Sequence, residues 1–460
     1  MTTQFAVDSS TISAVATPPG RGGIGIIRLS GPLSLSIAEA ITDNKFTPRH
    51  AHFCQFKDTN GAILDAGIGL FFPGPQSFTG EDVVELQAHG GPIVLDLILK
   101  ECFRHGARPS KPGEFSERAY LNDKIDLAQA EAIADLINST TEQAAFNAAQ
   151  SLQGAFSNRI NTLTTAVTKL RVYVEAAIDF PEEEIDFISE GRVKEKLEEI
   201  INLLHSVHLE ASQGRIMQEG LKAVIAGNPN AGKSSLLNAL SGHDTAIVTA
   251  TAGTTRDILR EHIQIEGMPL QVVDTAGFHS TADEIELEGM RRASQEMETA
   301  DRILLIIDSS AVRNEEDIRD QPLPEQYPIL KEDIPVTIIL NKCDLGCHGA
   351  SIDTQNKPPI IHLSAKTGIG MDLLKQHLKE LVGFEGRSEG IFSARRRHLD
   401  SLQAASEYLQ AGHNQLVHAG SPELLADDLF QCQKRLGEIT RPTTNDDLLS
   451  EIFSSFCIGK

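Results

Sequence analysis

The spacing of apolar and polar positions changes character along the chain, and residues 1–120 form the first region. They contain short β-branched and glycine-containing runs, such as 23–29 and 83–86, which are bounded by glycine and proline turns. Such runs between turn signals are typical of strands, whereas residues 92–100 have the spacing of a helix. We therefore predict an α+β domain over residues 1–120.

The pattern changes twice more. Residues 121–220 are rich in Ala, Leu, Glu and Gln with a helical period, as in 128–137. Residues 221–380 alternate apolar strands with helices, which is the signature of a parallel α/β domain. Because 381–460 returns to helical spacing, the simplest architecture inserts the α/β domain into an all-α domain built from both flanks.

Composition and charge narrow the class of protein. A chain of 460 residues is too long for one ordinary domain. With 40% hydrophobic and 23% charged residues it is not collagen-like, disordered or a disulfide scaffold. Its formal net charge of −23 argues against a protein that coats nucleic acid or an anionic membrane nonspecifically, but leaves room for a local basic patch.

The sequence also indicates in which cellular compartment the protein works. The apolar run 303–307 is far shorter than the roughly 20 residues that span a bilayer, and the N-terminus has no signal-peptide pattern. The six cysteines form no CxxC pair, and only Cys343, Cys347 and His348 hint at a metal site. We predict a cytoplasmic, reduced protein without a membrane segment.

A phosphate-binding motif follows a candidate strand at 221–226. Residues 227–234 read GxxxxGK[ST], and a candidate helix follows at 235–240. Glycines let the backbone approach phosphate, and the helix N-terminus adds N–H donors and a positive dipole. Lys233 is expected to reach the β- and γ-phosphates and Ser234 to coordinate Mg²⁺. The loop residues assigned to nucleotide binding are Asn230, Ala231, Gly232, Lys233, Ser234 and Ser235.

Three further motifs follow candidate strands in order. The first supplies a carboxylate for Mg²⁺ and a glycine amide for the γ-phosphate; the third suits a backbone contact with the guanine carbonyl. In the second, Asp344 can accept hydrogen bonds from guanine N–H groups that adenine lacks, so GTP is favoured over ATP. The three motifs are Asp274-Thr275-Ala276-Gly277, Asn341-Lys342-Cys343-Asp344 and Ser364-Ala365-Lys366.

These motifs resemble those of the translation-factor-related Ras-like GTPases, with one departure. Phe278 stands where those proteins have a water-positioning glutamine, so another group must orient the water or hydrolysis is slow. Asn230 suits a monovalent cation whose charge would act like an arginine finger. Residues 249–257 suit a switch loop around that cation, and the acids of 283–286 are either near the water or ordinary solvated charges. The predicted ligands of Mg²⁺ or the monovalent cation are Ser234, Asn230, Thr249, Thr251, Thr254 and Thr255.

Motifs along the whole chain carry a closer resemblance. They lie at 17–23, 78–82 (FTGED), 113–116 (GEFS), 121–131 and 456–460 (FCIGK). Together they resemble the MnmE (TrmE) family of tRNA modification GTPases, collinearly over essentially all 460 residues. The C-terminal FCIGK is the most specific of these motifs.

The resemblance implies a homodimer joined through the N-terminal domain, in which the GTPase domains pair in a potassium-dependent way. Asn230 matches the potassium-binding asparagine of the family, and Glu286 matches the glutamate that orients the catalytic water. Arg256 and Asp257 match a switch motif. The implied catalytic residues are therefore Glu286, Lys233 and Thr255.

The resemblance further implies that 5-formyltetrahydrofolate or a related folate donates a carbon unit. The product would be a (carboxymethyl)aminomethyl group at position 5 of the wobble uridine of certain tRNAs. Arg28 or Lys124 suits the glutamyl carboxylate, and Glu85 suits the donor edge of a pterin. Cys457 is either a nucleophile that adds to the uracil ring or a small residue of the tail. The matched folate positions are Arg28, Glu85, Lys124 and Lys460.

Partners complete the expectation. The family works with the FAD-dependent MnmG (GidA) in a heterotetramer or larger complex. The basic clusters 395–398 and 434–435 are either the best local candidates for tRNA contact or ordinary solvated helix faces. Two other functions stay open. One is a regulatory GTPase switch, for instance in ribosome assembly, with the N-terminal domain as a docking module. The other is a folate enzyme with a vestigial GTPase domain.

Overall fold

The computed structural model of the chain describes most of its residues and separates them into two compact units. One unit comprises Met1–Ile137, Ser151–Leu204 and Ser401–Lys460, and the other comprises Asn138–Gln150 and His205–Asp400. No helix in the described ranges has the length and apolar character to cross a membrane. The described residues are 9–179, 193–228, 230–241, 260–265, 268–274, 300–311, 334–345, 349–355, 358–382, 392–419, 421–441, 449, 452–454 and 456–459.

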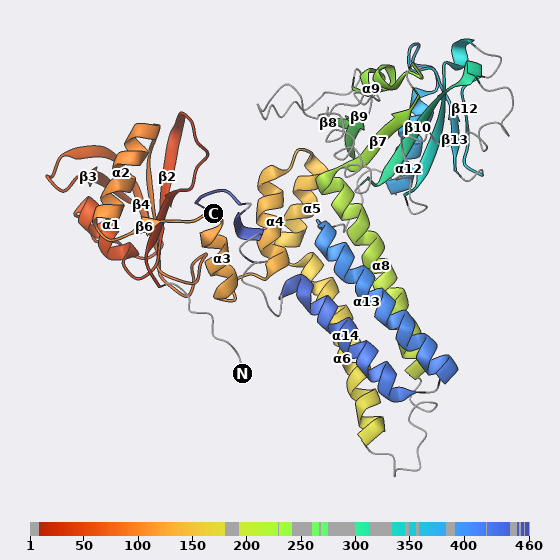
Figure 1. The fold of residues 1–460 in the computed structure, drawn as a ribbon. Helices are drawn as coiled ribbons and strands as arrows, with labels where there is room; N and C mark the ends of the chain where they lie inside the picture. Colours follow the sequence, from red (N-terminus) through yellow and green to blue (C-terminus); the bar gives the residue numbers. More distant parts are fainter. Residues whose placement is uncertain are drawn as a thin grey trace, which may run out of the picture. The chain divides into compact units, whose positions relative to one another are not determined.

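The N-terminal part is a six-stranded sheet of order β3-β4-β5-β2-β1-β6. Neighbouring strands are antiparallel, except that β1 and β6 are parallel. Helices α1 and α2 pack on one face, where they bury a core that includes Ile27, Leu29 and Ile98 (Figure 1). The elements are β1 (Ile12–Val15), β2 (Gly22–Ser30), α1 (Ser34–Thr42), β3 (His52–Lys57), β4 (Ile63–Phe72), β5 (Val83–Gly90), α2 (Pro92–Arg104), β6 (Arg108–Pro109) and α3 (Glu114–Leu121).

The opposite face of this sheet is only partly covered. Alternate residues of a strand point to opposite faces, so Arg28 points away from the core side that holds Ile27 and Leu29. On that second face Phe115 of α3 packs against Ile12 and Ala14 of β1. Arg28 therefore lies beside α3, on the side of the sheet away from α1 and α2.

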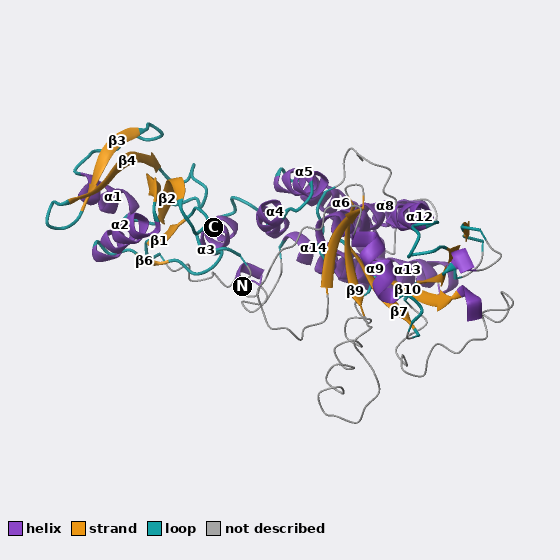
Figure 2. Cartoon of the chain, turned by 90° about the horizontal axis from the view of Figure 1, so that it is seen from above, coloured by secondary structure: helices purple, strands orange, loops and turns teal. Residues whose placement is uncertain are grey.

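The helical part confirms the expected insertion. Helices α6 and α14, which are far apart in the sequence, pack side by side (Figure 1). These helices are drawn in purple in Figure 2. The elements are α4 (Leu127–Asn138), α5 (Glu142–Leu152), α6 (Ala155–Asp179), α8 (Val193–Glu219), α13 (Arg396–Asn414), the π-helix η3 (Gln415–Ala419) and α14 (Pro422–Thr440).

The inserted part is a seven-stranded sheet of order β12-β13-β11-β10-β7-β9-β8. Strands β9, β7, β10, β11 and β13 run parallel, and β8 and β12 are antiparallel edge strands. The carboxyl ends of the parallel strands meet at one edge, which is where α/β folds bind ligands. The predicted fold class is therefore confirmed, while the exact domain boundaries stay a prediction. The elements are β7 (Leu221–Gly227), α9 (Lys233–Ser241), β8 (Arg260–Ile265), β9 (Met268–Asp274), β10 (Arg302–Asp308), η1 (Ser309–Ala311), β11 (Val336–Asn341), η2 (Cys343–Leu345), β12 (Ser351–Asp353), β13 (Ile360–His362) and α12 (Met371–Val382).

Candidate nucleotide site and N-terminal ligand site

The phosphate loop has the predicted strand–loop–helix form. Strand β7 ends at Gly227, whose φ is +147°, and a Cβ there would lie 2.3 Å from the carbonyl oxygen of Ile306 on β10. Asn230 (φ +64°) and Gly232 (φ +104°) also lie in the left-handed region, which only glycine adopts freely and asparagine tolerates. Helix α9 begins at Lys233 directly after this turn.

Lys233 points back into the loop that precedes it. Its ammonium donates to the carbonyl oxygens of Gly227 at 2.7 Å and Asn228 at 3.2 Å, and the residue is buried. Ser234 and Ser235 are exposed in the first turn of α9. The loop therefore presents a lysine and two serine side chains at a helix N-terminus, where phosphate and Mg²⁺ bind.

Asn341 links the phosphate loop to the two loops expected to contact the base. Its Nδ2 donates to the carbonyl oxygen of Ala231 at 2.8 Å, and its Oδ1 accepts from the backbone N–H of Ala365 at 3.0 Å. Gly232 makes room for this amide, because a Cβ there would lie 2.1 Å from Nδ2. With both of its groups used inside the protein, the buried Asn341 side chain holds the site together.

Lys342 has a partner that the sequence did not reveal. Its ammonium lies 2.6 Å from Oδ2 of Asp308, and its backbone has φ +65°. Oδ1 of Asp308 accepts from the N–H of Ser310 at 3.0 Å and from its hydroxyl at 2.7 Å. Burial alone would raise the pKa of Asp308, but the hydrogen bonds from Lys342 and Ser310 hold it below its ordinary value. One feature of the sequence could have indicated this partner. Asp308 is the last residue of β10, as Asn341 is of β11, and the two residues are paired in register.

The two guanine loops present the predicted groups. Asp344 is exposed in η2, after the buried Cys343. Ser364 is buried, and its turn is closed by the Ser364 N–H donating to the Ile369 carbonyl at 2.8 Å and by the Gly368 N–H donating to the Ser364 carbonyl at 2.9 Å. Lys366 is exposed on this turn. The structure therefore brings the motifs of β7, β11 and β13 to one edge of the sheet.

Of the predicted cation ligands, Asn230 and Ser234 are described, whereas the threonines of 249–255 and the predicted water-orienting Glu286 lie outside the described residues. Strand β9 ends at Asp274, of which only the backbone is described. Among the described residues no group of three or more His, Cys, Asp or Glu side chains forms a metal site. Of the three residues that hinted at a metal site in the sequence, only Cys343 is described, and burial raises the pKa of its thiol. The predicted residues outside the described ranges are Thr249, Thr251, Thr254, Thr255, Arg256, Asp257, Thr275, Ala276, Gly277, Phe278, Asp283, Glu284, Glu286, Cys347, His348 and Lys460.

In the N-terminal part, Arg28 and Glu85 are brought together by strand pairing. They are directly opposite in the β2–β5 register, and Nε and Nη2 of Arg28 donate to Oε1 of Glu85 at 3.0 and 2.8 Å. Lys124 is occupied differently, because its ammonium donates to the Pro75 carbonyl at 2.9 Å. The expectation that Lys124 meets a glutamyl carboxylate therefore stays a prediction.

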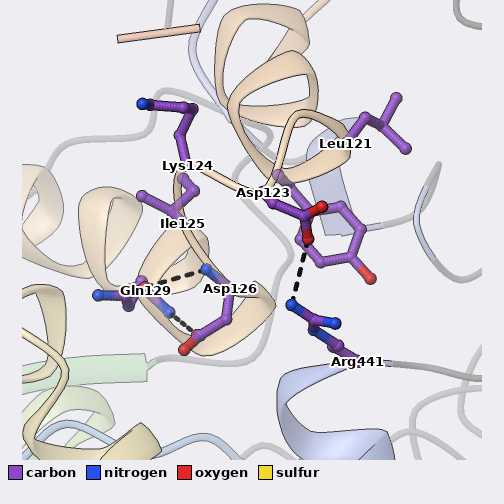
Figure 3. Close-up of a pocket in the computed structure, with 8 residues that line it drawn as sticks. Leu121, Asp123, Lys124, Ile125, Asp126, Gln129 and Arg441 are labelled. Atoms are coloured by element: carbon purple, nitrogen blue, oxygen red, sulfur yellow. Dashed lines mark hydrogen bonds and ion pairs between the residues drawn. The ribbon is translucent and has the colours of Figure 1, made fainter. Parts of the chain in front are cut away.

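A pocket of about 350 Å³ lies beside Lys124 (Figure 3). Asp123 and Arg441 form an ion pair of 3.1 Å there, and the Lys124 side chain extends away from Arg441. Asp126 and Gln129 exchange two hydrogen bonds, as a capping pair at the start of α4 does. These polar groups are used to order the turn from α3 to α4.

The C-terminal tail returns to the N-terminal part (Figure 1). The N–H of Gly113 donates to the Cys457 carbonyl at 3.3 Å, and Ile458 pairs with Pro112. A Cβ on Gly459 would lie 2.4 Å from the Val15 carbonyl oxygen, so the tail lies tightly against β1. The exposed Cys457 is thereby held next to the start of α3.

A mostly parallel sheet with a phosphate loop after its inner strand β7, and with NKxD and SAK loops at the same edge, defines a P-loop GTPase. Two family models cover most of the chain: the GTP-binding protein TrmE N-terminus matches residues 11–124, and the MnmE helical domain matches residues 127–457. The chain belongs to the MnmE family of tRNA modification GTPases.

Individual relatives agree with the family models. The tRNA modification GTPase MnmE of Proteus mirabilis (strain HI4320) is 56% identical over 453 residues, covering 98% of this chain and 99% of the relative. The protein of the same name from Vibrio cholerae serotype O1 is 55% identical over 455 residues, covering 98% and 100%. Among solved structures, the FeoB G-domain of Methanococcus jannaschii is 27% identical, covers 35% of this chain and 98% of that chain, and has a TM-score of 0.26, which adds nothing to the fold argument.

Proposed function

We propose that this chain is the GTP-hydrolysing component of a cytoplasmic enzyme that installs (carboxymethyl)aminomethyl at position 5 of the wobble uridine of certain tRNAs. The observation that carries the proposal is the assembled nucleotide site, in which Asn341 joins the phosphate loop to the guanine loops, in a chain of this family. The Arg28–Glu85 pair supports a second ligand site in the N-terminal part.

GTP and Mg²⁺ fit the groups at the edge of the sheet. Lys233 exchanges its two carbonyl partners for the β- and γ-phosphate oxygens. Mg²⁺, held by Ser234, Thr255 and Asp274, supplies charge neutralisation when bound. Asp344 accepts the guanine N–H groups and so sets the base preference.

Hydrolysis needs a substitute for the missing glutamine, and we assign it to potassium and Glu286. Asn230 belongs to a left-handed turn of the phosphate loop, which suits a carbonyl-type ligand near the β-phosphate. Thr249, Thr251 and Thr254 of the switch loop complete the proposed cation site, and the GTPase domains of two chains pair when the cation is bound. GTP turnover should be much faster in KCl than in NaCl, and equal rates would reject this part of the proposal. Glu286→Ala should abolish turnover and leave GTP binding nearly unchanged.

The folate donor is assigned to Arg28, Glu85, Lys124 and Lys460. Glu85 fits the pterin end of a folate, because that edge donates N–H groups that a carboxylate can accept, and Arg28 holds the carboxylate in place by its two hydrogen bonds. The half-buried position of the pair strengthens these interactions relative to water. Cys457, held at the start of α3, is the proposed nucleophile or a spacer of the tail.

A homodimer is supported by the partly open face of the N-terminal sheet. Phe53 is 77% exposed and lies opposite Ile68, which is 39% exposed, on the face away from α1 and α2. Aromatic and aliphatic side chains exposed together on a sheet mark a contact surface. We propose that a second copy of the chain covers this face.

The basic clusters support an obligate partner for tRNA binding. In 395–398, His398 is buried and accepts from the Arg395 N–H at 3.1 Å, and Arg396 is the only exposed residue of the four. In 434–435, Arg435 pairs with Glu438 at 3.2 Å. Because phosphate contacts dominate affinity for nucleic acid, we propose that the FAD-dependent MnmG partner supplies most of them. Tight, salt-resistant tRNA binding by the purified chain alone would contradict this.

The function is tested by nucleoside analysis of tRNA from cells that lack this chain. We expect loss of the modified wobble uridine with other modified nucleosides unchanged, restored by the wild-type chain and not by Lys233→Ala. Unchanged wobble uridine would overturn the proposal and favour a regulatory GTPase.

A further inference from the structure

Two sequence motifs that the nucleotide site does not use, FTGED (78–82) and GEFS (113–116), meet around Arg28. The guanidinium carbon of Arg28 lies 5.7 Å from the ring centroid of Phe78 and 5.8 Å from that of Phe115. Phe115 is fully buried, whereas Phe78 is 39% exposed. Arg28 therefore has aromatic neighbours from both motifs, and only Phe78 also reaches solvent.

Ion pairs tie the two motifs to each other. The buried Arg118 contacts Glu81 through Nη1 at 2.9 Å and Glu114 through Nη2 at 3.0 Å. Nη1 of Arg108 donates to the other carboxylate oxygen of Glu114 at 2.8 Å. On the β2 side, the Ser30 hydroxyl donates to Glu81 at 2.7 Å. Charged pairs this buried fix geometry, since breaking one leaves an unpaired charge.

The loop that carries Phe78 is also fixed from the α3–α4 turn. The Asn122 side-chain amide donates to the Thr79 carbonyl at 2.7 Å, and Lys124 donates to the Pro75 carbonyl at 2.9 Å. A Cβ on Gly80 would lie 3.1 Å from Cβ of Asn122 and 3.3 Å from Cδ of Lys124, so the two segments are in close contact. Lys124 thus contacts the segment that carries Phe78.

Glu85 keeps one oxygen for a ligand. Both Arg28 donors use Oε1, and no described residue donates to Oε2. A carboxylate oxygen presented beside an exposed aromatic ring suits a flat heterocycle that carries N–H donors on one edge. The ring packs against the heterocycle face, and the oxygen accepts from its edge.

We propose that Phe78 is a specificity-determining residue of the N-terminal site, forming the wall against which a pterin-type heterocycle packs, and that Lys124 is a positioning residue for the loop that carries Phe78. This inference rests on the proposed folate function. It gives Lys124 a role in the folate site that acts through the loop carrying Phe78, in place of the alternative in which Lys124, and not Arg28, meets the glutamyl carboxylate.

The test measures equilibrium binding to the full-length chain of three ligands: 5-formyltetrahydrofolate, 6-methyltetrahydropterin and p-aminobenzoylglutamate. Phe78→Leu should weaken the first two by about three- to tenfold, the range of an aromatic pair, and leave p-aminobenzoylglutamate unchanged. Phe78→Trp keeps a flat ring, so its dissociation constants for the two pterin ligands should stay within about twofold of wild type. Phe146→Leu on α5, which removes another exposed ring, is the matched control.

Lys124 is tested with the same ligands. Lys124→Met should weaken the pterin ligands but not p-aminobenzoylglutamate, and Lys124→Arg should restore binding. Selective loss of p-aminobenzoylglutamate in Lys124→Met would show direct carboxylate binding and overturn the positioning role. No loss, or equal loss for all three ligands, in Phe78→Leu would overturn the role of Phe78 while leaving the folate function in place. A wild-type chain that binds none of the three would overturn the folate assignment and this inference with it.

Discussion

Replacing Asn341 with alanine cuts the side-chain link between the phosphate loop and the loops that follow β11 and β13. In the wild type its amide satisfies the Ala231 carbonyl at 2.8 Å and the Ala365 N–H at 3.0 Å, at a position only 3% exposed. A buried backbone group left without a partner costs about 1–3 kcal/mol, so two such groups cost about 2–6 kcal/mol. Loss of about 3 kcal/mol corresponds to about a hundredfold in a binding constant.

We expect this loss to appear in nucleotide affinity, because GTP must contact all three loops in one arrangement. Titration of a fluorescent GDP analogue should give a Kd about a hundredfold above wild type for Asn341→Ala. Asn238→Ala, at an exposed asparagine of α9, is the matched control and should bind as wild type does. Circular dichroism checks that both variants are folded. A folded Asn341→Ala variant with a Kd within about threefold of wild type would refute the linking role.

Three further predictions concern the packing and charge of the two sites. In Gly227→Ala, a Cβ 2.3 Å from the Ile306 carbonyl oxygen at φ +147° should lower the free energy of unfolding by about 3 kcal/mol; an unchanged denaturation midpoint would contradict that close approach. For Glu114, burial alone would raise the pKa, but hydrogen bonds from its arginine neighbours hold it below the ordinary value. The stability difference between wild type and Glu114→Gln should thus be full at pH 7 and shrink as the pH falls below about 4, and a difference independent of pH would argue against an ionised partner. Asp308→Asn removes the 2.6 Å ion pair with Lys342 and should weaken GDP binding by about fivefold; unchanged binding would mean that the pair does not order the lysine.

The nucleotide site could be located from the sequence because its motifs are local. A strand, a glycine loop and a helix are encoded within 221–240, and each base-contacting motif directly follows its own strand. The side-chain contacts that the sequence did not reveal join segments that are far apart in the chain. Ala231 and Asn341 are 110 residues apart, and the pairing of Asp308 with Lys342 depends on the register of β10 with β11. Periodicity predicts that strands exist, but not which residues stand opposite each other.

The N-terminal site shows the same limit. The resemblance named Arg28 and Glu85, but that they form an ion pair depends on the β2–β5 register. The sequence left open whether Arg28 or Lys124 meets a glutamyl carboxylate, and it did not reveal the contact of the Lys124 ammonium with the Pro75 carbonyl, which arises because the α3–α4 turn packs on the loop before β5. The neighbourhood of Phe78 and Arg28 is likewise set by tertiary contacts of residues 50 apart.

The central claim, a GTPase whose base preference is set by the loop after β11, is tested most directly by exchanging the base. Guanine offers N–H donors to the Asp344 carboxylate, whereas xanthine has a carbonyl at C2 that an amide N–H can meet. The measurement is kcat/KM for GTP and for XTP with the wild type and Asp344→Asn. We predict that the wild type prefers GTP by about a hundredfold or more and that Asp344→Asn prefers XTP. A variant that keeps the wild-type preference for GTP would contradict the account.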